Sequence, residues 1–239
     1  MTLLNRLIQL LTNPRLAVER YFLPLVIIER YLLSFRKFVL CELDLNEDPR
    51  KKATTQIGVR QARLDDLEKL AKMRSSEERF GKNRVDKPRY ALLLQERLKS
   101  GHQCFIAEGA DMVLGYVWIA FLEFHVSEMK RKITLKNDEA MLYDVYTSSF
   151  YRGKEIFPRI AEVAFDSLRK NHYEKIYFIT RKCNKPMINA GKKLNAKMVE
   201  ALTFIGILMF TRLTRVSLRH DFGNAGAHER ERIRWNKTQ

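Results

Sequence analysis

A short basic turn, Tyr-Arg-Gly-Lys at residues 151–154, is well suited to binding an anion. It follows a run of strand-forming residues, and helical spacing of apolar residues begins just after it. A helix N-terminus presents unpaired N–H groups and a partial positive charge, to which Arg152 and Lys154 add full charges. Gly153 permits a left-handed backbone or the close approach of a ligand. We therefore expect a turn that suits a diphosphate; the alternative is a basic turn without a ligand.

A second basic segment follows further along the chain. Six cations occur there without an intervening Asp or Glu: Arg181, Lys182, Lys185, Lys192, Lys193 and Lys197. Asn184 opens a predicted helix over residues 184–194, with Pro186 in its first turn. This run of cations suits a phosphorylated, anionic ligand. The alternatives are a solvated basic face and an Asn184 that only caps the helix.

The hydrophobic pattern around these two segments predicts alternating strands and helices. Single strands are expected at residues 57–62, 140–147 and 174–180. Two strands each are expected within residues 104–121 and 196–218. Helices are expected after Asp65, around 90–98, from 156 to about 168, and at 184–194. The charged stretch 128–139 is expected to be a loop.

The chain is expected to divide into a main domain and flanking segments. Residues 1–45 form a leucine-rich helical extension that ends in a strand, and residues 46–56 form a polar linker. The main domain then covers residues 57–219. Residues 220–239 are predicted to be a loose basic tail.

Composition excludes several classes of protein. The 239 residues are 46% hydrophobic, too apolar for a disordered chain. Three scattered cysteines and five histidines give no metal-ligand spacing, so we expect no metal and a reduced, cytoplasmic protein. The apolar run at residues 21–28 is far shorter than the roughly 18–20 residues of a membrane span.

The net charge of +16 favours an anionic partner. No helix-turn-helix, zinc-finger or aromatic RNA-binding pattern accompanies it, so nucleic acid is not expected. Residues 1–35 combine leucine and isoleucine stripes with basic residues. This stripe is expected either to dock on the sheet or on a partner subunit, or to lie on an anionic membrane surface and make the protein peripheral to it.

At residues 143–157, YDVYTSSFYRGKEIF, the chain resembles the GNAT superfamily of acyl-CoA-dependent N-acyltransferases. The segment NKPMINAGKKLN, residues 184–195, is similar to the family's second cofactor-contacting segment. The order of expected elements from Ile57 to about Arg219 also matches. The resemblance implies an α/β (α+β) fold: a mixed, mostly antiparallel sheet that splays between its fourth and fifth strands and is flanked by helices.

The resemblance also implies a reaction, in which an acyl group, most simply acetyl, moves from acyl-CoA to an amine. The amine, on a small molecule or a protein, would attack the thioester directly. Backbone groups near Tyr146 and Thr147 would pair with the pantetheine arm. The other expected cofactor contacts are Tyr151, Arg152, Gly153, Lys154 and Asn184.

This reaction needs a base for the amine and an acid for the leaving thiolate. Asp144 and Glu139 are the candidate bases near the fourth strand, and Tyr143 is a candidate acid. The two carboxylates would face opposite sides of a regular strand, unless a bulge intervenes. The structural alternatives are an Asp144 bound to backbone or to an arginine, and a Tyr143 packed in the core.

Three positions depart from the family's pattern. Counting from Arg152, the turn's two small residues are replaced by Glu155 and Phe157. Glu155 adds a like charge near a diphosphate unless its side chain points away, and Phe157 adds bulk. The tyrosine that is commonly the family's acid falls at Gly191. A degenerate GNAT-fold binding or interaction module is therefore the alternative to an enzyme.

Overall fold

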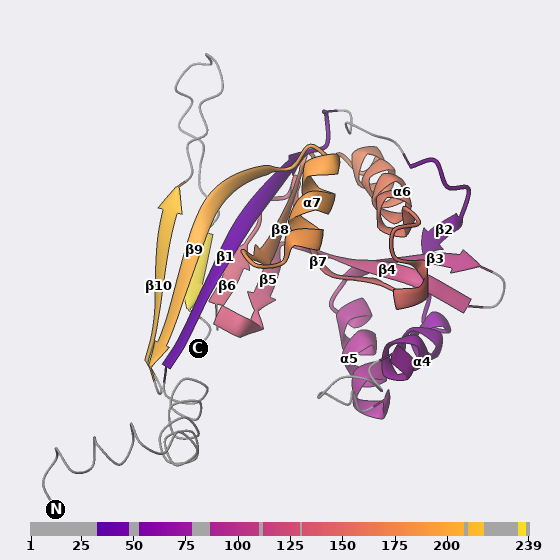
Figure 1. Ribbon diagram of the computed structural model, residues 1–239, viewed down its shortest axis with the longest axis horizontal. Coiled ribbons are helices and arrows are strands. Elements are labelled where there is room, and N and C mark those ends of the chain that lie inside the picture. Colours follow the sequence, from indigo (N-terminus) through magenta and orange to yellow (C-terminus); the bar gives the residue numbers. More distant parts are fainter. Residues whose placement is uncertain are drawn as a thin grey trace, which may run out of the picture.

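The computed structural model describes residues 33–47, 53–77, 87–109, 112–129, 131–207, 210–217 and 234–237. Its main sheet contains β1 (Leu33–Asp44), β2 (Gly58–Gln61), β3 (Gln103–Gly109), β4 (Met112–Phe121), β7 (Glu139–Thr147), β8 (Lys175–Arg181), β9 (Lys197–Ile207) and β10 (Phe210–Ser217). The strand order is β10-β9-β1-β8-β7-β4-β3-β2 (Figure 1). The β7–β8 pair is parallel and the other neighbours are antiparallel. This confirms the predicted mixed, mostly antiparallel sheet.

Two pairs of helices cover opposite faces of this sheet (Figure 1). One face carries α4 (Asp66–Glu77) and α5 (Lys87–Lys99), and the other carries α6 (Ile156–Lys170) and α7 (Lys185–Lys193). The apolar residues of α6 recur at helical spacing and are buried against the sheet: Ile156, Ile160, Ala161, Ala164, Phe165 and Leu168. The predicted helix at residues 156–168 is therefore confirmed.

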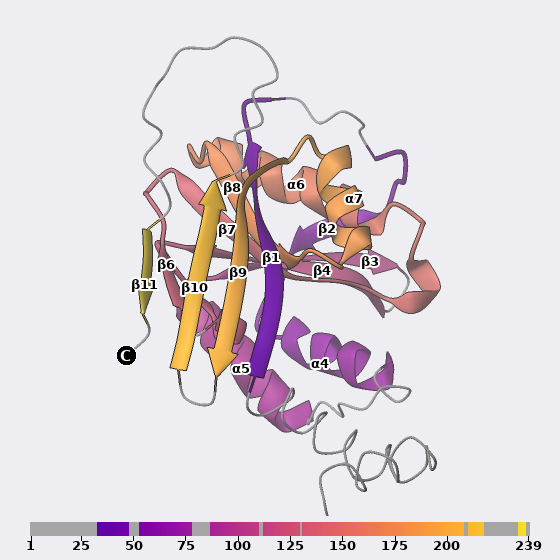
Figure 2. The same ribbon diagram turned by 60° about the vertical axis from the view of Figure 1, so that its left-hand side comes forward.

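The strand at the end of the predicted extension belongs to the main sheet (Figure 2). β1 pairs with β8 on one side and with β9 on the other. The predicted division between residues 1–45 and the main domain is therefore wrong for this strand, since its edges are taken up by strands that follow more than a hundred residues later. Residues 1–32 lie outside the described ranges, so the helices predicted there, and the membrane or docking role of residues 1–35, stay predictions.

A second, three-stranded sheet has the order β11-β6-β5, with β5 at Glu123–Val126, β6 at Arg131–Thr134 and β11 at Arg234–Lys237. The loop predicted at 128–139 and the loose tail predicted at 220–239 are therefore wrong at residues 131–134 and 234–237. Ile133 and its neighbours are buried against Phe38 and Leu40 of β1. The strands were missed because each has four residues, too few for a visible alternation among charged side chains.

The sheet opens between β7 and β8, as the resemblance implied. Their pairing runs only from Glu139 opposite Lys175 to Met141 opposite Tyr177. Beyond that point β7 stays paired with β4 as far as Thr147, while β8 stays paired with β1. In the described part of the chain, the last residues of β7 therefore have no strand on their β8 side. No described helix is long and apolar enough to cross a membrane.

Candidate functional site

Beyond Met141, no described strand pairs with β7 on its β8 side, and the carbonyl of Thr147 accepts Nε of Arg152. On its other edge, Tyr146 pairs with Tyr116 and Thr147 pairs with Gly115 of β4. An extended ligand can bind such an edge as an added strand would. The two positions predicted to lie along a pantetheine arm, Tyr146 and Thr147, are at this edge.

The turn that follows β7 leads directly into α6. Gly153 has a φ of 81°, and Glu155, the residue before α6, has a left-handed φ of 56°. The side chain of Glu155 makes no cap hydrogen bond to the start of this helix. Arg152 and Lys154 are exposed beside it. The turn therefore presents a helix N-terminus that Glu155 does not cap and two cations, which is the arrangement that favours a bound anion.

Contacts within the chain hold the side chains of this turn in place. Nε of Arg152 donates to the carbonyl of Thr147 over 3.4 Å. Nζ of Lys154 lies 4.9 Å from the centre of the Tyr151 ring. The hydroxyl of Tyr151 donates to Sδ of Met112 over 3.7 Å. The structure thus gathers the four residues predicted at positions 151–154 around one helix end.

The two departures from the family's turn are both directed away from it. The carboxylate of Glu155 accepts hydrogen bonds from the backbone N–H and the hydroxyl of Thr54, at 3.0 and 2.6 Å. Phe157 is 9% exposed and lies in the core beneath α6. The carboxylate of Glu155 is therefore directed toward Thr54, and the ring of Phe157 is directed into the core.

After β8, the side chain of Asn184 caps the start of α7. Oδ1 of Asn184 accepts the N–H of Met187 at 3.4 Å, and its Nδ2 donates to the hydroxyl of Thr180 at 3.0 Å. Asn184 thus caps α7, as the structural alternative expected. The lysines of this segment are exposed: Lys182, Lys185, Lys192, Lys193 and Lys197.

Gly191 has no room for a side chain. A Cβ atom there would lie 2.6 Å from Cζ of Phe178 in β8, closer than real Cβ contacts. The tyrosine that the family commonly carries at this position would therefore collide with the ring of Phe178.

Asp144 lies at a bulge in β7. Its φ is 44°, and the register with β4 shifts between Tyr116 and Trp118. Oδ2 of Asp144 lies 2.6 Å from Nη1 of Arg97 in α5. The hydroxyls of Tyr116 and Tyr90 donate to the same carboxylate at 3.4 and 3.5 Å. The bulge therefore turns Asp144 toward α5, where an arginine holds it.

Tyr143 also faces α5, beside Asp144. Its hydroxyl lies 2.6 Å from Nδ1 of His102, and the guanidinium of Arg97 lies 5.0 Å from its ring centre. Burial raises the pKa of Tyr143, so the phenol stays protonated and can donate. Burial, and then the charge of Arg97, lower the pKa of His102, which favours its neutral imidazole.

Glu139 lies where β7 and β8 are still paired. It is 5% exposed and accepts the N–H of Lys136 at 3.0 Å and the hydroxyl of Tyr177 at 3.3 Å. It precedes Asp144 by five residues, which is roughly 15 Å along a strand. The structure therefore brings Tyr143, Asp144 and Tyr146 together at the opening and keeps Glu139 apart from them.

Sequence analysis did not identify the partners of Asp144. Arg97 and Tyr90 come from α5, Tyr116 from β4, and His102 from the turn before β3. An arginine on a helix and tyrosines in strands are ordinary residue types, so no local signal marked them. The indole N–H of Trp118 is buried in the same cluster with no hydrogen-bond partner among the described residues.

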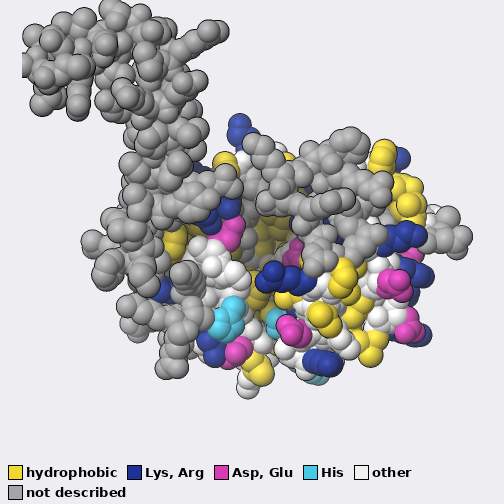
Figure 3. All heavy atoms as spheres, turned by 90° about the horizontal axis from the view of Figure 1, so that it is seen from below, with side chains coloured by type: hydrophobic (Ala, Val, Ile, Leu, Met, Phe, Trp, Pro, Cys, Tyr) yellow, Lys and Arg dark blue, Asp and Glu magenta, His cyan; other side chains and the backbone are white. Residues whose placement is uncertain are grey.

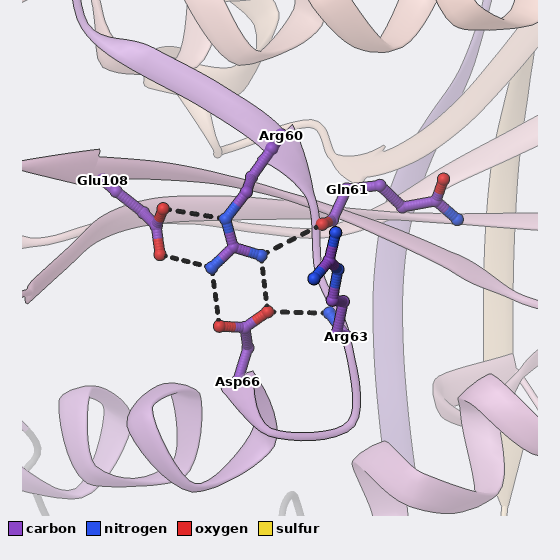
Figure 4. A network of polar contacts seen from close by, with 5 residues as sticks. All are labelled: Arg60, Gln61, Arg63, Asp66 and Glu108. Atoms are coloured by element: carbon purple, nitrogen blue, oxygen red, sulfur yellow. Dashed lines mark hydrogen bonds and ion pairs between the residues drawn. The ribbon is translucent and has the colours of Figure 1, made fainter.

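A network of ion pairs fixes α4 to the edge of the sheet (Figure 4). The guanidinium of Arg60 in β2 binds Asp66 at 2.7 and 2.8 Å and Glu108 at 2.6 and 2.8 Å. The hydrogen bond from Arg60 lowers the pKa of Asp66 to about 2, helped by the N–H of Arg63. α4 is thereby positioned so that the guanidinium of Arg74 lies 4.3 Å from the ring centre of Tyr146.

The face that α4 and α5 form carries side chains of both charges (Figure 3). Hydrophobic side chains lie in a hollow near the middle of this view, with Lys and Arg side chains beside it. Among the described residues, no group of three or more His, Cys, Asp or Glu could hold a metal ion.

A family model described as the acetyltransferase (GNAT) family matches residues 67–195, more than half of the chain. The chain therefore belongs to the GNAT acetyltransferase family. The matched residues include the whole of β7 and β8 and the two turns that lead from these strands into α6 and α7.

Solved structures show the same fold. An acetyltransferase of the GNAT family from Colwellia psychrerythraea is 9% identical, with a TM-score of 0.53 over 74% of this chain and 58% of its own. A functionally unknown conserved protein from Staphylococcus epidermidis is 8% identical, with a TM-score of 0.50 over 72% of this chain and 62% of its own. This chain thus spans less than two thirds of either protein.

A predicted acetyltransferase with acetyl-CoA from Clostridium acetobutylicum is 18% identical, with a TM-score of 0.43 over 56% of this chain and 88% of its own. At these identities the likenesses concern the fold alone. None of the curated proteins matches this sequence.

Proposed function

We propose that this chain transfers an acyl group from acyl-CoA to an amine. The observation that carries the proposal is the way β7 and β8 separate after Met141 and Tyr177. Each strand then leads into a helix whose first turn is flanked by basic side chains. An extended thioester between the strands, with its phosphates at the helix ends, fits this arrangement.

The turn after β7 is the proposed diphosphate site. The N–H groups of Ile156 and Phe157, the first two residues of α6, and the side chains of Arg152 and Lys154 would bind the phosphate oxygens, whereas Pro158 has no N–H to offer. Gly153 supports this role, because a Cβ there would meet nothing within 4 Å and its φ of 81° suits glycine. The pantetheine amides would pair with the open edge of β7 near Tyr146 and Thr147, which places the thioester near the bulge.

The amine would attack the thioester carbonyl carbon, and the thiolate would leave with a proton from the protein. We propose Asp144 as the base, acting directly or through water, because it lies at the opening, whereas Glu139 is buried beside Tyr177. Arg97 would orient its carboxylate. The phenol of Tyr143 is the proposed acid, because Tyr143 is next to Asp144 in β7 and its hydroxyl lies 2.6 Å from Nδ1 of His102.

Calorimetry on the full chain tests this proposal with CoA, acetyl-CoA and pantetheine, which lacks the diphosphate. We expect CoA and acetyl-CoA to bind with similar affinity and pantetheine to bind at least about a hundredfold more weakly, since about 2.7 kcal/mol of the affinity would come from the diphosphate. No CoA binding at millimolar concentration would overturn the proposal.

A second measurement separates an enzyme from the alternative. Release of free CoA from acetyl-CoA is followed in the presence of a panel of primary amines, with the Asp144→Asn variant as control. Transfer that the variant loses supports the enzyme. CoA binding without transfer would indicate a GNAT-fold binding module, which the absence of space for a tyrosine at Gly191 favours.

A further inference from the structure

Glu155 is in an unusual position for a carboxylate. It precedes the first residue of α6 with a left-handed φ of 56°, yet it makes no side-chain cap to the helix. A carboxylate at the start of a helix is ordinarily stabilised by the first N–H groups and by the helix dipole. In this chain, the same N–H groups are the proposed ligands of a diphosphate. A Glu155 side chain turned toward the helix would therefore compete with the ligand.

Thr54 holds the Glu155 carboxylate in another place. Oε2 of Glu155 accepts the backbone N–H of Thr54 at 3.0 Å and its hydroxyl at 2.6 Å. Hydrogen bonds to an ionised group are shorter and stronger than neutral ones. The two residues are 101 positions apart, so the contact exists only in the folded chain.

The residues that follow Thr54 are attached to α6 and to the core. The carbonyl of Ile57 accepts Nε of Arg159 in α6 at 3.5 Å, and the Ile57 side chain packs against the core. Thr54 is therefore three residues away from a point at which the chain is held.

We propose that Thr54 is a positioning residue for the anion site: by holding Glu155, it leaves the start of α6 and its two cations to the ligand. The inference rests on the proposed binding of CoA at this turn. A released carboxylate about 5 Å from a diphosphate would repel it enough to weaken binding by up to about a hundredfold. Affinity for CoA and the placement of residues 53–57 are thereby coupled, and the coupling is reciprocal.

A double-mutant cycle tests the proposal, with CoA affinity measured by calorimetry. Thr54→Val keeps the shape and the backbone N–H but removes the hydroxyl, the shorter of the two bonds that hold Glu155, and we expect it to weaken CoA binding by about tenfold at low salt. The effect should shrink at 1 M salt, where charges are screened within about 3 Å. Glu155→Gln alone should change the affinity less than about threefold. In the double variant, Glu155→Gln should restore the affinity, because no charge remains to be released.

Thr54→Ser is the matched control, since serine keeps the hydroxyl, and it should bind CoA as the unmodified chain does. Full CoA affinity in Thr54→Val, or no recovery in the double variant, would overturn the inference while leaving the proposed function intact.

If the unmodified chain binds no CoA, the proposed function fails and a ligand-free readout decides the inference. We expect the hydrogen-exchange rates of the Ile156 and Phe157 amides to be at least about threefold lower in Thr54→Val. The released carboxylate would then accept hydrogen bonds from these amides. Equal exchange in both proteins would contradict a positioning role for Thr54.

Discussion

The two strand–turn–helix corners beside the opening differ in how their helices begin. In the corner after β7, Glu155 has a left-handed conformation and its side chain does not cap α6. The corner after β8 caps α7 with its own Asn184, and both helices have a proline in the first turn, Pro158 in α6 and Pro186 in α7. The first corner therefore keeps donors available for a ligand, whereas the second satisfies its own donors. The proposed diphosphate site belongs to the first corner, although both corners are basic.

The two corners also use glycine for different reasons. Gly153 has a φ of 81° and open space around it, so it is required by the backbone conformation. Gly191 lies in α7, and glycine is required there because the ring of Phe178 occupies the space that a side chain would need. One glycine shapes a binding turn, and the other lets a helix approach a strand.

The largest expected effect is on the anion site itself. Arg152→Glu should weaken CoA binding by about a hundredfold or more, because it replaces an attraction of about 3 kcal/mol with a repulsion. Lys185→Glu at the other corner should cost less than about tenfold. Calorimetry at low salt measures both, with Lys69→Glu on α4 as control. Equal losses at the two corners would remove the distinction between them.

Gly191→Ala should destabilise the fold by about 1–3 kcal/mol, because the added methyl overpacks the contact with Phe178. Urea unfolding measures the change, and Asn189→Ala on the exposed side of α7 is the matched control. CoA affinity of the folded variant should change little. An unchanged unfolding midpoint would show that α7 can move away from β8.

Gly153→Ala should cost about 1–2 kcal/mol of stability, since alanine is strained in a left-handed conformation even where nothing collides with it. Gly58→Ala is the control, because its Cβ also meets nothing and its φ is outside the left-handed region. Thermal unfolding compares the two. A neutral Gly153→Ala would mean that the turn relaxes to another conformation, and its CoA affinity would then fall.

The smallest expected effect is that of Asn184→Ala, which removes a cap worth about 1 kcal/mol. If Asn184 only caps α7, the variant loses stability and keeps its CoA affinity within about threefold. Asn184→Ser, which retains a capping oxygen, should recover most of the stability. A loss of CoA affinity beyond about tenfold in both variants would instead make Asn184 a ligand contact, as the resemblance implied.

Features that depend on neighbouring residues could be predicted from the sequence. The apolar spacing of α6, the cap at Asn184 and the basic turn at residues 151–154 each involve residues within a few positions of one another. Helical periodicity and capping are set over one or two turns, so they are visible in a short window. Apart from β5 and β6, the order of elements within the main domain followed from these local patterns.

Contacts between distant residues were decided only by the tertiary structure. Sequence analysis predicted a strand near β1, but its place between β8 and β9 depends on strands more than a hundred residues away. The bulge that turns Asp144 toward Arg97 and the contact of Glu155 with Thr54 likewise join residues 47 and 101 positions apart. A local pattern identifies a charged side chain, but the direction of that side chain depends on backbone conformation and on which distant element packs beside it. For this reason the sequence indicated an anion-binding turn, and the folded chain determined where the turn's own negative charge lies.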